Sequence, residues 1–318
     1  MRKDIEAMAD MQCSDERNAP LQGARDHLLV AIVIASVGRP DMLEQMIECL
    51  SQQSESADFI VLSVTSAVDL PQGFQDSAEI RTIIGDKGSC CQRNRAIDLV
   101  QPHCDIVMFY DDDFIPSINS IKNLRRFFED NPHISGATGN VLADGANNSG
   151  ISSELGKEIV RKHDEKIVYD GKIIAYVDGL YGCNMACRAG DIGSNRFDER
   201  LPLYGWQEDI DFSASLRASG KLAKTAAFAG VHQGVKHGRT SGVRFGYSQI
   251  INPLYLARKG TIRKRVALNL VIRNLLINHA RSIRPEPWVD RRGRVAGNWI
   301  GLIDAIRGRV TPERILTL

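Results

Sequence analysis

The sequence predicts an α/β protein in which helices cover both faces of a parallel sheet. Residues 28–37 form a continuous apolar run without polar alternation, which is typical of a strand buried on both faces. Further apolar runs alternate with segments of helical spacing up to residue 128, and their connections are short. The 318 residues are 43% hydrophobic and 25% charged, as expected of a globular chain that buries a large core.

The elements of the first half follow one another in alternating order. Apolar runs predict strands at 28–37, 59–64, 80–84 and 105–110. Apolar residues three and four positions apart predict helices at 41–50, 89–100 and 118–128. Ser89 is the predicted N-cap of the second helix, because a serine oxygen accepts the free backbone N–H groups of a first turn.

The second half is less regular and ends in a basic region. After Gly139 we expect a loop rich in glycine and asparagine, then mixed strands and one helix near 210–218. From Arg258 the chain is predicted to be helical, with a break at 284–287. Residues 258–318 hold 14 lysines and arginines against 4 acidic residues, whereas residues 1–257 hold 26 against 35. This tail suits an anionic surface, either membrane or nucleic acid.

Composition also bears on the compartment. The seven cysteines are odd in number and scattered, which favours a reducing cytoplasm. Residues 1–26 are polar and acidic, so we expect a loose leader rather than a secretory signal. No apolar stretch reaches the roughly 18–20 residues that a membrane span needs.

Polar side chains follow three of the predicted strands. Ser36 and Arg39 follow the first strand, Ser63 closes the second, and Asp111–Asp113 follow the fourth. Because ligands bind at the carboxyl ends of parallel strands, we expect these residues at one ligand-binding edge of the sheet.

The run Asp111-Asp112-Asp113 is the sharpest feature. In extended backbone Asp111 and Asp113 share a face and Asp112 points the other way. Two carboxylates aimed into a ligand edge suit Mg²⁺ or Mn²⁺, with phosphates and waters completing the coordination shell. The alternative is an acidic turn that caps the following helix.

A second acidic cluster lies at 206–211. Asp209 lies beside Glu208 and close to Trp206, and carboxylates next to aromatic rings suit sugars. A carboxylate here can act as general base on a hydroxyl. The alternative is a helix N-terminus, where acidic residues in the first turn are favoured by the helix dipole.

Two further residues have weaker signals. Gly88-Ser89 at a helix start, with Arg93 one turn later, offers donors to a diphosphate, although a solvated arginine is the usual outcome and no Walker P-loop is present. His232 follows the apolar run 226–231 and is a metal ligand only if the fold brings it near Asp113.

The C-terminal stretch 262–284 alternates apolar runs with arginine and lysine. A basic amphipathic helix of this kind lies on an anionic bilayer surface. The alternative is a helix packed on the core with solvated arginines. Nucleic-acid binding is not expected, because aromatic residues do not interleave with the basic ones.

Six motifs in order over residues 28–232 resemble family 2 glycosyltransferases, and the stretch 292–318 is similar to the tail of bacterial members involved in surface polysaccharides. The motifs are Ser36–Pro40, Gly88–Asn94, Asp111–Asp113, Tyr181–Ala186, Gly205–Asp211 and Val231–His232. The resemblance implies a GT-A fold, with a Rossmann-like, mostly parallel central sheet and a basic helical C-terminal extension. It divides the chain into a leader (1–26), a nucleotide-sugar-binding half (27–140), an acceptor-binding half (141–235) and the extension (236–318).

The resemblance also implies residue roles. Asp113, Asp111 and His232 would hold Mg²⁺ or Mn²⁺, and Asp209 would be the catalytic base. The implied donor-binding residues are Ser36, Arg39, Ser63, Arg93, Asp111 and Asp112. The implied acceptor-binding residues are Asn184, Trp206 and Glu208.

The implied activity is hexosyl transfer with inversion from a nucleotide-sugar to a hydroxyl of a glycan or lipid-linked acceptor. We expect it in cell-surface glycan synthesis, in the cytoplasm or peripherally on the inner membrane face. The segment 63–66 lacks the acidic residues that many members carry, so the nucleobase stays unassigned. Without a Gln-x-x-Arg-Trp motif or membrane spans, one sugar per event is favoured. The alternatives are a sugar-phosphate nucleotidyltransferase and a non-catalytic nucleotide- or glycan-binding module.

Overall fold

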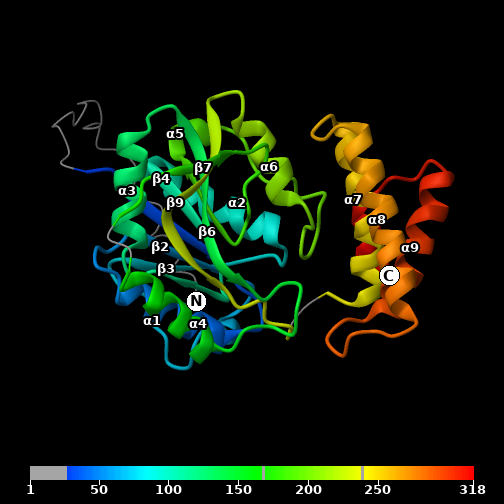
Figure 1. Cartoon of the computed structure of the whole chain (residues 1–318), viewed down its shortest axis with the longest axis horizontal. Helices are drawn as coiled ribbons and strands as arrows, with labels where there is room; N and C mark the ends of the chain where they lie inside the picture. The colour runs from blue at the N-terminus through cyan, green and yellow to red at the C-terminus, as the bar shows by residue number, and fades with distance from the viewer. Residues whose placement is uncertain (1–26, 167–168, 238–239) are drawn as a thin grey trace, which may run out of the picture.

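A computed structural model describes residues 27–166, 169–237 and 240–318, and it confirms the α/β class (Figure 1). The predicted leader at 1–26 lies outside the described residues. The strands are β1 (Val30–Ala35), β2 (Phe59–Val64), β3 (Ile80–Ile84), β4 (Ile106–Asp111), β5 (Phe114–Pro116), β6 (Ile134–Asp144), β7 (Ile173–Tyr176), β8 (Asn184–Arg188) and β9 (Lys221–His232).

All these strands belong to one mixed sheet. Its order is β3-β2-β1-β4-β8-β6-β9-β5, and β7 pairs with β9 beside this path. The half β3-β2-β1-β4 is entirely parallel. β8 runs against β4 and β6, β5 and β7 run against β9, and β6 and β9 are parallel. Most strands therefore run in one direction, as predicted.

The helices are α1 (Pro40–Ser51), α2 (Ser89–Val100), α3 (Ser120–Asp130), α4 (Ser153–Asp164), α5 (Ala189–Ile192), α6 (Glu208–Leu216), α7 (Gly242–Lys259), α8 (Lys264–Ser282) and α9 (Arg291–Ile306). α1 and α3 pack on one face of the sheet, where Leu43 and Phe127 join Ile32 in the core. α2 and α6 pack on the other face, around Val33. The alternating inward faces of β1 are thus both buried, which explains its unbroken apolar run.

The structure corrects the sequence predictions in two details, the N-cap of α2 and two helices. Gly88, not Ser89, is the N-cap of α2, and its φ of 147° favours glycine. The predicted division between 140 and 141 lies within β6 of this one sheet, and it remains a prediction. α4 and the first four turns of α7 were not predicted as helices.

The last three helices pack against one another beside the sheet (Figure 1). Two glycines let α7 approach α9: a Cβ on Gly246 would lie 2.2 Å from the Arg294 carbonyl oxygen, and one on Gly297 would lie 2.0 Å from that of Val243. Amide side chains join the three helices, because Asn278 donates to Gln249 and to Asn298. The predicted C-terminal helical extension is confirmed. Among the helices of the described ranges, none is both long and apolar enough to cross a membrane.

Candidate functional site

The candidate site lies at the carboxyl end of β4, where the chain turns sharply into β5. Asp111 ends β4 and Phe114 begins β5, so Asp112 and Asp113 form the turn. Strand register then brings His232 to this turn, since His232 is paired with Phe114 on one side and with Asp144 on the other. The sheet itself thus brings together residues more than a hundred positions apart.

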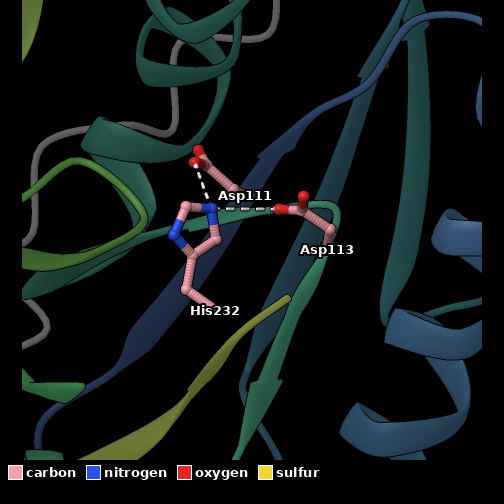
Figure 2. Close-up of side chains that lie close together, drawn as sticks. All are labelled: Asp111, Asp113 and His232. Atoms are coloured by element: carbon pink, nitrogen blue, oxygen red, sulfur yellow. Dashed lines mark ion pairs between the residues drawn. The ribbon is translucent and has the colours of Figure 1, made fainter. Parts of the chain in front are cut away.

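Asp111, Asp113 and His232 form a candidate cation site (Figure 2). One ligand atom from each lies within 4.8 Å of the others. His232 Nε2 is 3.4 Å from an Asp113 oxygen and 3.9 Å from an Asp111 oxygen. Asp113 and His232 are buried, whereas the Asp111 side chain is 32% exposed, which leaves the cluster open on one side.

The charges of this cluster suit a divalent cation. Burial lowers the pKa of His232, but hydrogen bonds to Asp113 and Asp144 outweigh it and raise that pKa to about 10. Burial likewise opposes ionisation of Asp113, but His232 and Arg39 outweigh it and lower its pKa. The protonated ring therefore supplies the positive charge that two neighbouring carboxylates need. A bound cation would supply the same charge and release the ring proton. Two carboxylates and an imidazole are donors that Mn²⁺ and Mg²⁺ accept.

His232 is oriented by Asp144, which the sequence did not indicate, and Asp144 is in turn bound by Tyr181 of the motif Tyr181–Ala186. The Nδ1 atom of His232 donates to Asp144 Oδ1 at 2.9 Å, which turns Nε2 toward Asp111 and Asp113. The Tyr181 hydroxyl donates to the second oxygen of Asp144 at 3.0 Å. Such a carboxylate–imidazole pair holds a metal-ligating histidine in one tautomer and orientation.

Asp112 points away from the cluster, as predicted. It accepts hydrogen bonds from Ser36 Oγ at 2.7 Å and from Arg39 Nη1 at 3.0 Å. Burial raises the pKa of Asp112 even though Arg39 lowers it. The Arg39 Nε atom donates to the carbonyl of His237. Ser36, Arg39 and Asp112, all predicted to bind the donor, are thus joined by hydrogen bonds to the Asp112 carboxylate.

Arg93 joins the two acidic clusters. It is fully buried and donates to Asp111 at 2.9 Å, to Glu208 at 2.5 Å and to the Gly182 carbonyl at 3.2 Å. Phe109 and Phe197 pack against the guanidinium group. The alternative of a solvated arginine is therefore wrong, because three acceptors and two rings replace its water.

Asp209 and Glu208 begin α6 directly beyond this arginine. Asp209 accepts from the backbone N–H groups of Gly182 and Ile210. Burial raises the pKa of Asp209, and burial together with the Asp209 charge raises that of Glu208. The N-cap residue Gln207 has a φ of 74°, in the left-handed region that costs a residue with a Cβ about 1 kcal/mol or more. The strained turn aims the Asp209 carboxylate back at Gly182.

The remaining predicted residues lie in different surroundings. Trp206 is partly buried and packs edge-on against Phe245 of α7, with 6.1 Å between ring centroids. Ser63 is fully buried and accepts from Arg95. Asn184 is fully buried in β8, and its side-chain amide has no hydrogen-bond partner among the described residues. The predicted acceptor contact of Asn184 remains a prediction.

Two buried side chains that the sequence did not indicate, Gln92 and Asp69, fix the backbone at the carboxyl ends of β1 and β2. Gln92 donates to the carbonyl oxygens of Ser36 and Ser63, which ties the ends of β1 and β2 to α2. Asp69 accepts from the backbone N–H groups of Gly38, Thr65 and Ser66. Only their positions in the sequence could have indicated this role. Gln92 lies one turn into α2, and Asp69 lies shortly after β2.

Comparison with known proteins bears on the fold. No family model and no curated protein matches the sequence. The crystal structure of S. aureus TarS 1–349 matches with a TM-score of 0.52 at 12% identity, covering 92% of this chain and 83% of that one. The same TarS segment in complex with UDP-GlcNAc matches with a TM-score of 0.51 at 12% identity, covering 89% of this chain and 83% of that one. The chain therefore has a GT-A-like fold, as the sequence resemblance predicted.

Proposed function

We propose that this protein is an inverting, metal-dependent glycosyltransferase that moves one sugar from a nucleotide-sugar to a hydroxyl of a glycan or lipid-linked acceptor. One observation carries the proposal: Arg93 connects an open Asp-Asp-His cluster to a buried carboxylate at the ligand edge of a GT-A-like sheet. The TarS structure in complex with UDP-GlcNAc supports a nucleotide-sugar as the donor class.

The Asp111–Asp113–His232 group fits Mg²⁺ or Mn²⁺, and the imidazole favours Mn²⁺ of the two. When bound, the cation supplies positive charge that stabilises the departing diphosphate without proton transfer. Asp113 and His232 are the buried, fixed ligands, and Asp144 keeps the ring in place. Asp111 is shared with Arg93, so the exposed carboxylate has a fixed direction too.

Asp209 accepts the proton of the attacking acceptor hydroxyl. The acceptor oxygen then forms a bond to the anomeric carbon from the face opposite the leaving group. The bond from that carbon to the diphosphate oxygen breaks, and the nucleoside diphosphate keeps the electron pair. A raised pKa makes Asp209 a stronger base, and two backbone N–H groups fix its direction.

Donor contacts are proposed for Arg39, Ser36, Ser63, Arg93 and Asp112. Arg39 supports this role, because its Nη2 atom has no hydrogen-bond partner among the described residues and is therefore available to a phosphate. Trp206 and Glu208 are proposed at the acceptor side, next to Asp209. We place the activity in cell-surface glycan synthesis at the cytoplasmic face of the membrane.

Product analysis tests the proposal. The protein is incubated with Mn²⁺, a panel of nucleotide-sugars and glycan or lipid-linked acceptors, and released nucleoside diphosphate and glycosylated product are measured. We expect transfer with one donor class, loss of at least 100-fold in Asp209→Asn and Asp113→Ala, and full activity in Asp178→Asn, whose side chain is 98% exposed.

Full activity in both site variants would reject the assignment. Release of pyrophosphate from a nucleoside triphosphate and a sugar phosphate would indicate the nucleotidyltransferase instead. Donor binding without turnover over the whole acceptor panel would favour the non-catalytic binding module.

A further inference from the structure

The outer sides of α8 and α9 expose an unusual number of large apolar side chains. We name this surface the α8–α9 outer face. Its exposed apolar residues are Leu268, Ile272, Leu276 and Ile283 at α8, and Trp299, Ile303 and Ile306 on α9. Leu276 is 66% exposed and Ile306 is 85% exposed. Gathered apolar side chains of this size mark an interaction surface rather than ordinary scattered exposure.

Helix spacing collects these residues on one side of each helix. Leu268, Ile272 and Leu276 follow one another at four-residue intervals, and so do Trp299 and Ile303, with Ile306 three positions on. The buried residues of α8, Ala267, Val271 and Asn278, lie on a different side, about a third of the way around the helix. The exposed apolar row therefore lies outside the side on which α8 packs against the rest of the protein.

A contact between the two helices makes the surface continuous. The Trp299 indole N–H donates to His279 Nε2 at 3.1 Å, and the rings lie 5.8 Å apart. Because Leu276 and Ile283 are neighbours of His279 on α8, and Ile303 is a neighbour of Trp299 on α9, the apolar rows meet at this pair.

The charges around this face are of one sign. Arg265, Arg273, Arg284 and Arg292 are exposed, and no carboxylate of the described residues pairs with them. The acidic residues of 258–318 are engaged elsewhere. Glu286 pairs with Arg281 and Arg291, Asp290 caps α9, Asp304 pairs with Arg314, and Glu313 pairs with Arg200. The outer face therefore combines apolar side chains with unneutralised arginines.

We propose that the α8–α9 outer face binds the surface of an anionic lipid bilayer. The apolar side chains insert at the boundary between headgroups and acyl chains, and the arginines bind lipid phosphates. A second copy of the chain is a poorer occupant, because a symmetric contact through this face would bring the arginines of both copies together. The inference concerns binding alone and does not rest on the proposed transfer reaction.

Co-sedimentation of the full chain with vesicles tests this proposal. Phosphatidylcholine vesicles are compared with vesicles that also contain phosphatidylglycerol. We expect binding to the anionic vesicles that is weakened by salt, and about a tenfold lower partition coefficient for Leu276→Gln. Replacing Arg265 and Arg273 with glutamine removes two charges, each worth about fivefold in partition, so we expect about a twenty-five-fold loss.

Matched controls come from α4. Leu155→Gln changes a leucine that is 53% exposed on a helix, and the double change of Arg161 and Lys162 to glutamine removes the same charge. Both controls should bind as the parent does. Equal binding of Leu276→Gln and the parent, or equal losses in the α4 controls, would overturn the proposal. The proposal would also be overturned if gel filtration showed that Leu276→Gln loses self-association while it keeps its binding to vesicles.

Discussion

At the carboxyl end of β4, three consecutive aspartates point to three sets of partners. Asp111 accepts from the buried Arg93, Asp112 accepts from Ser36 and Arg39, and Asp113 faces His232. Alternation along the extended backbone separates Asp112 from its neighbours. These three residues therefore contribute both to the candidate cation site and to the contacts that hold Ser36 and Arg39 after β1.

The Asp144–His232 pair predicts a specific effect on metal affinity. Asp144→Ala removes the acceptor that holds His232 Nδ1, so the ring loses its preferred tautomer. We expect Mn²⁺ affinity, measured by isothermal titration calorimetry, to fall about 10–100-fold. Asp144→Asn keeps an acceptor oxygen, so its Mn²⁺ affinity should fall less. The control Asp178→Ala should bind Mn²⁺ with the affinity of the parent protein. Parent-like affinity in Asp144→Ala would show that this carboxylate does not position His232.

The pKa of Asp209 should set the acid limb of the pH dependence of kcat/KM. In the proposed mechanism the deprotonated form of Asp209 is the base, and burial raises its pKa, so kcat/KM should be full above that pKa and fall as pH decreases through it. Asp209→Asn should leave a low activity without this limb. An acid limb that persists unchanged in Asp209→Asn would assign the base to another group.

Part of the site was predictable from residues alone. Asp111 and Asp113 follow an apolar strand, whereas the roles expected for Asp209 and His232 came from the family resemblance. The Arg93–Glu208 ion pair was not predictable, because it joins residues 115 positions apart and depends on how α2 and α6 meet. Asp144 was missed because Ala-Asp-Gly-Ala at 143–146 is typical of a turn, and its role comes from β6–β9 register.

At the scale of elements, close packing of α7 and α9 depends on glycine. Gly297→Ala would place a methyl group 2.0 Å from the Val243 carbonyl oxygen, so the helices must separate. We expect a loss of about 1–3 kcal/mol in the free energy of unfolding, measured with urea. Gly190→Ala is the control, since nothing lies within 4 Å of its new Cβ. An unchanged midpoint in Gly297→Ala would contradict the close approach.

Elements differed in how well the sequence predicted them. The parallel strands β1, β2 and β4 were predictable because burial on both faces requires unbroken apolar runs. α4 was missed because Asn-Asn-Ser-Gly before it indicates a loop, although Ser152 then caps the helix. α7 was missed because Gly246 and Pro253 interrupt the helical pattern, and tertiary packing overrides both.

At the scale of the whole molecule, the C-terminal helices are coupled to the acidic segment that carries Asp209. Lys259 of α7 pairs with Asp198 and Asp211, and Asn252 donates to the Trp206 carbonyl. Displacement of this helical unit should therefore disturb the α6 N-terminus. The overall fold class and the basic extension were predictable, whereas this coupling was not, because it joins segments that are distant in sequence.

The central claim is that a nucleotide-sugar and a divalent cation share the Asp111–Asp113–His232 edge. A thermal-shift panel of nucleoside diphosphates, triphosphates and nucleotide-sugars, each with and without Mn²⁺, tests it most directly, since a ligand of the folded state raises Tm by mass action. We predict a Mn²⁺-dependent rise with one nucleoside diphosphate and its sugar conjugates, lost in Asp113→Ala. A rise confined to triphosphates, or one that persists without the cation and in Asp113→Ala, would contradict the account.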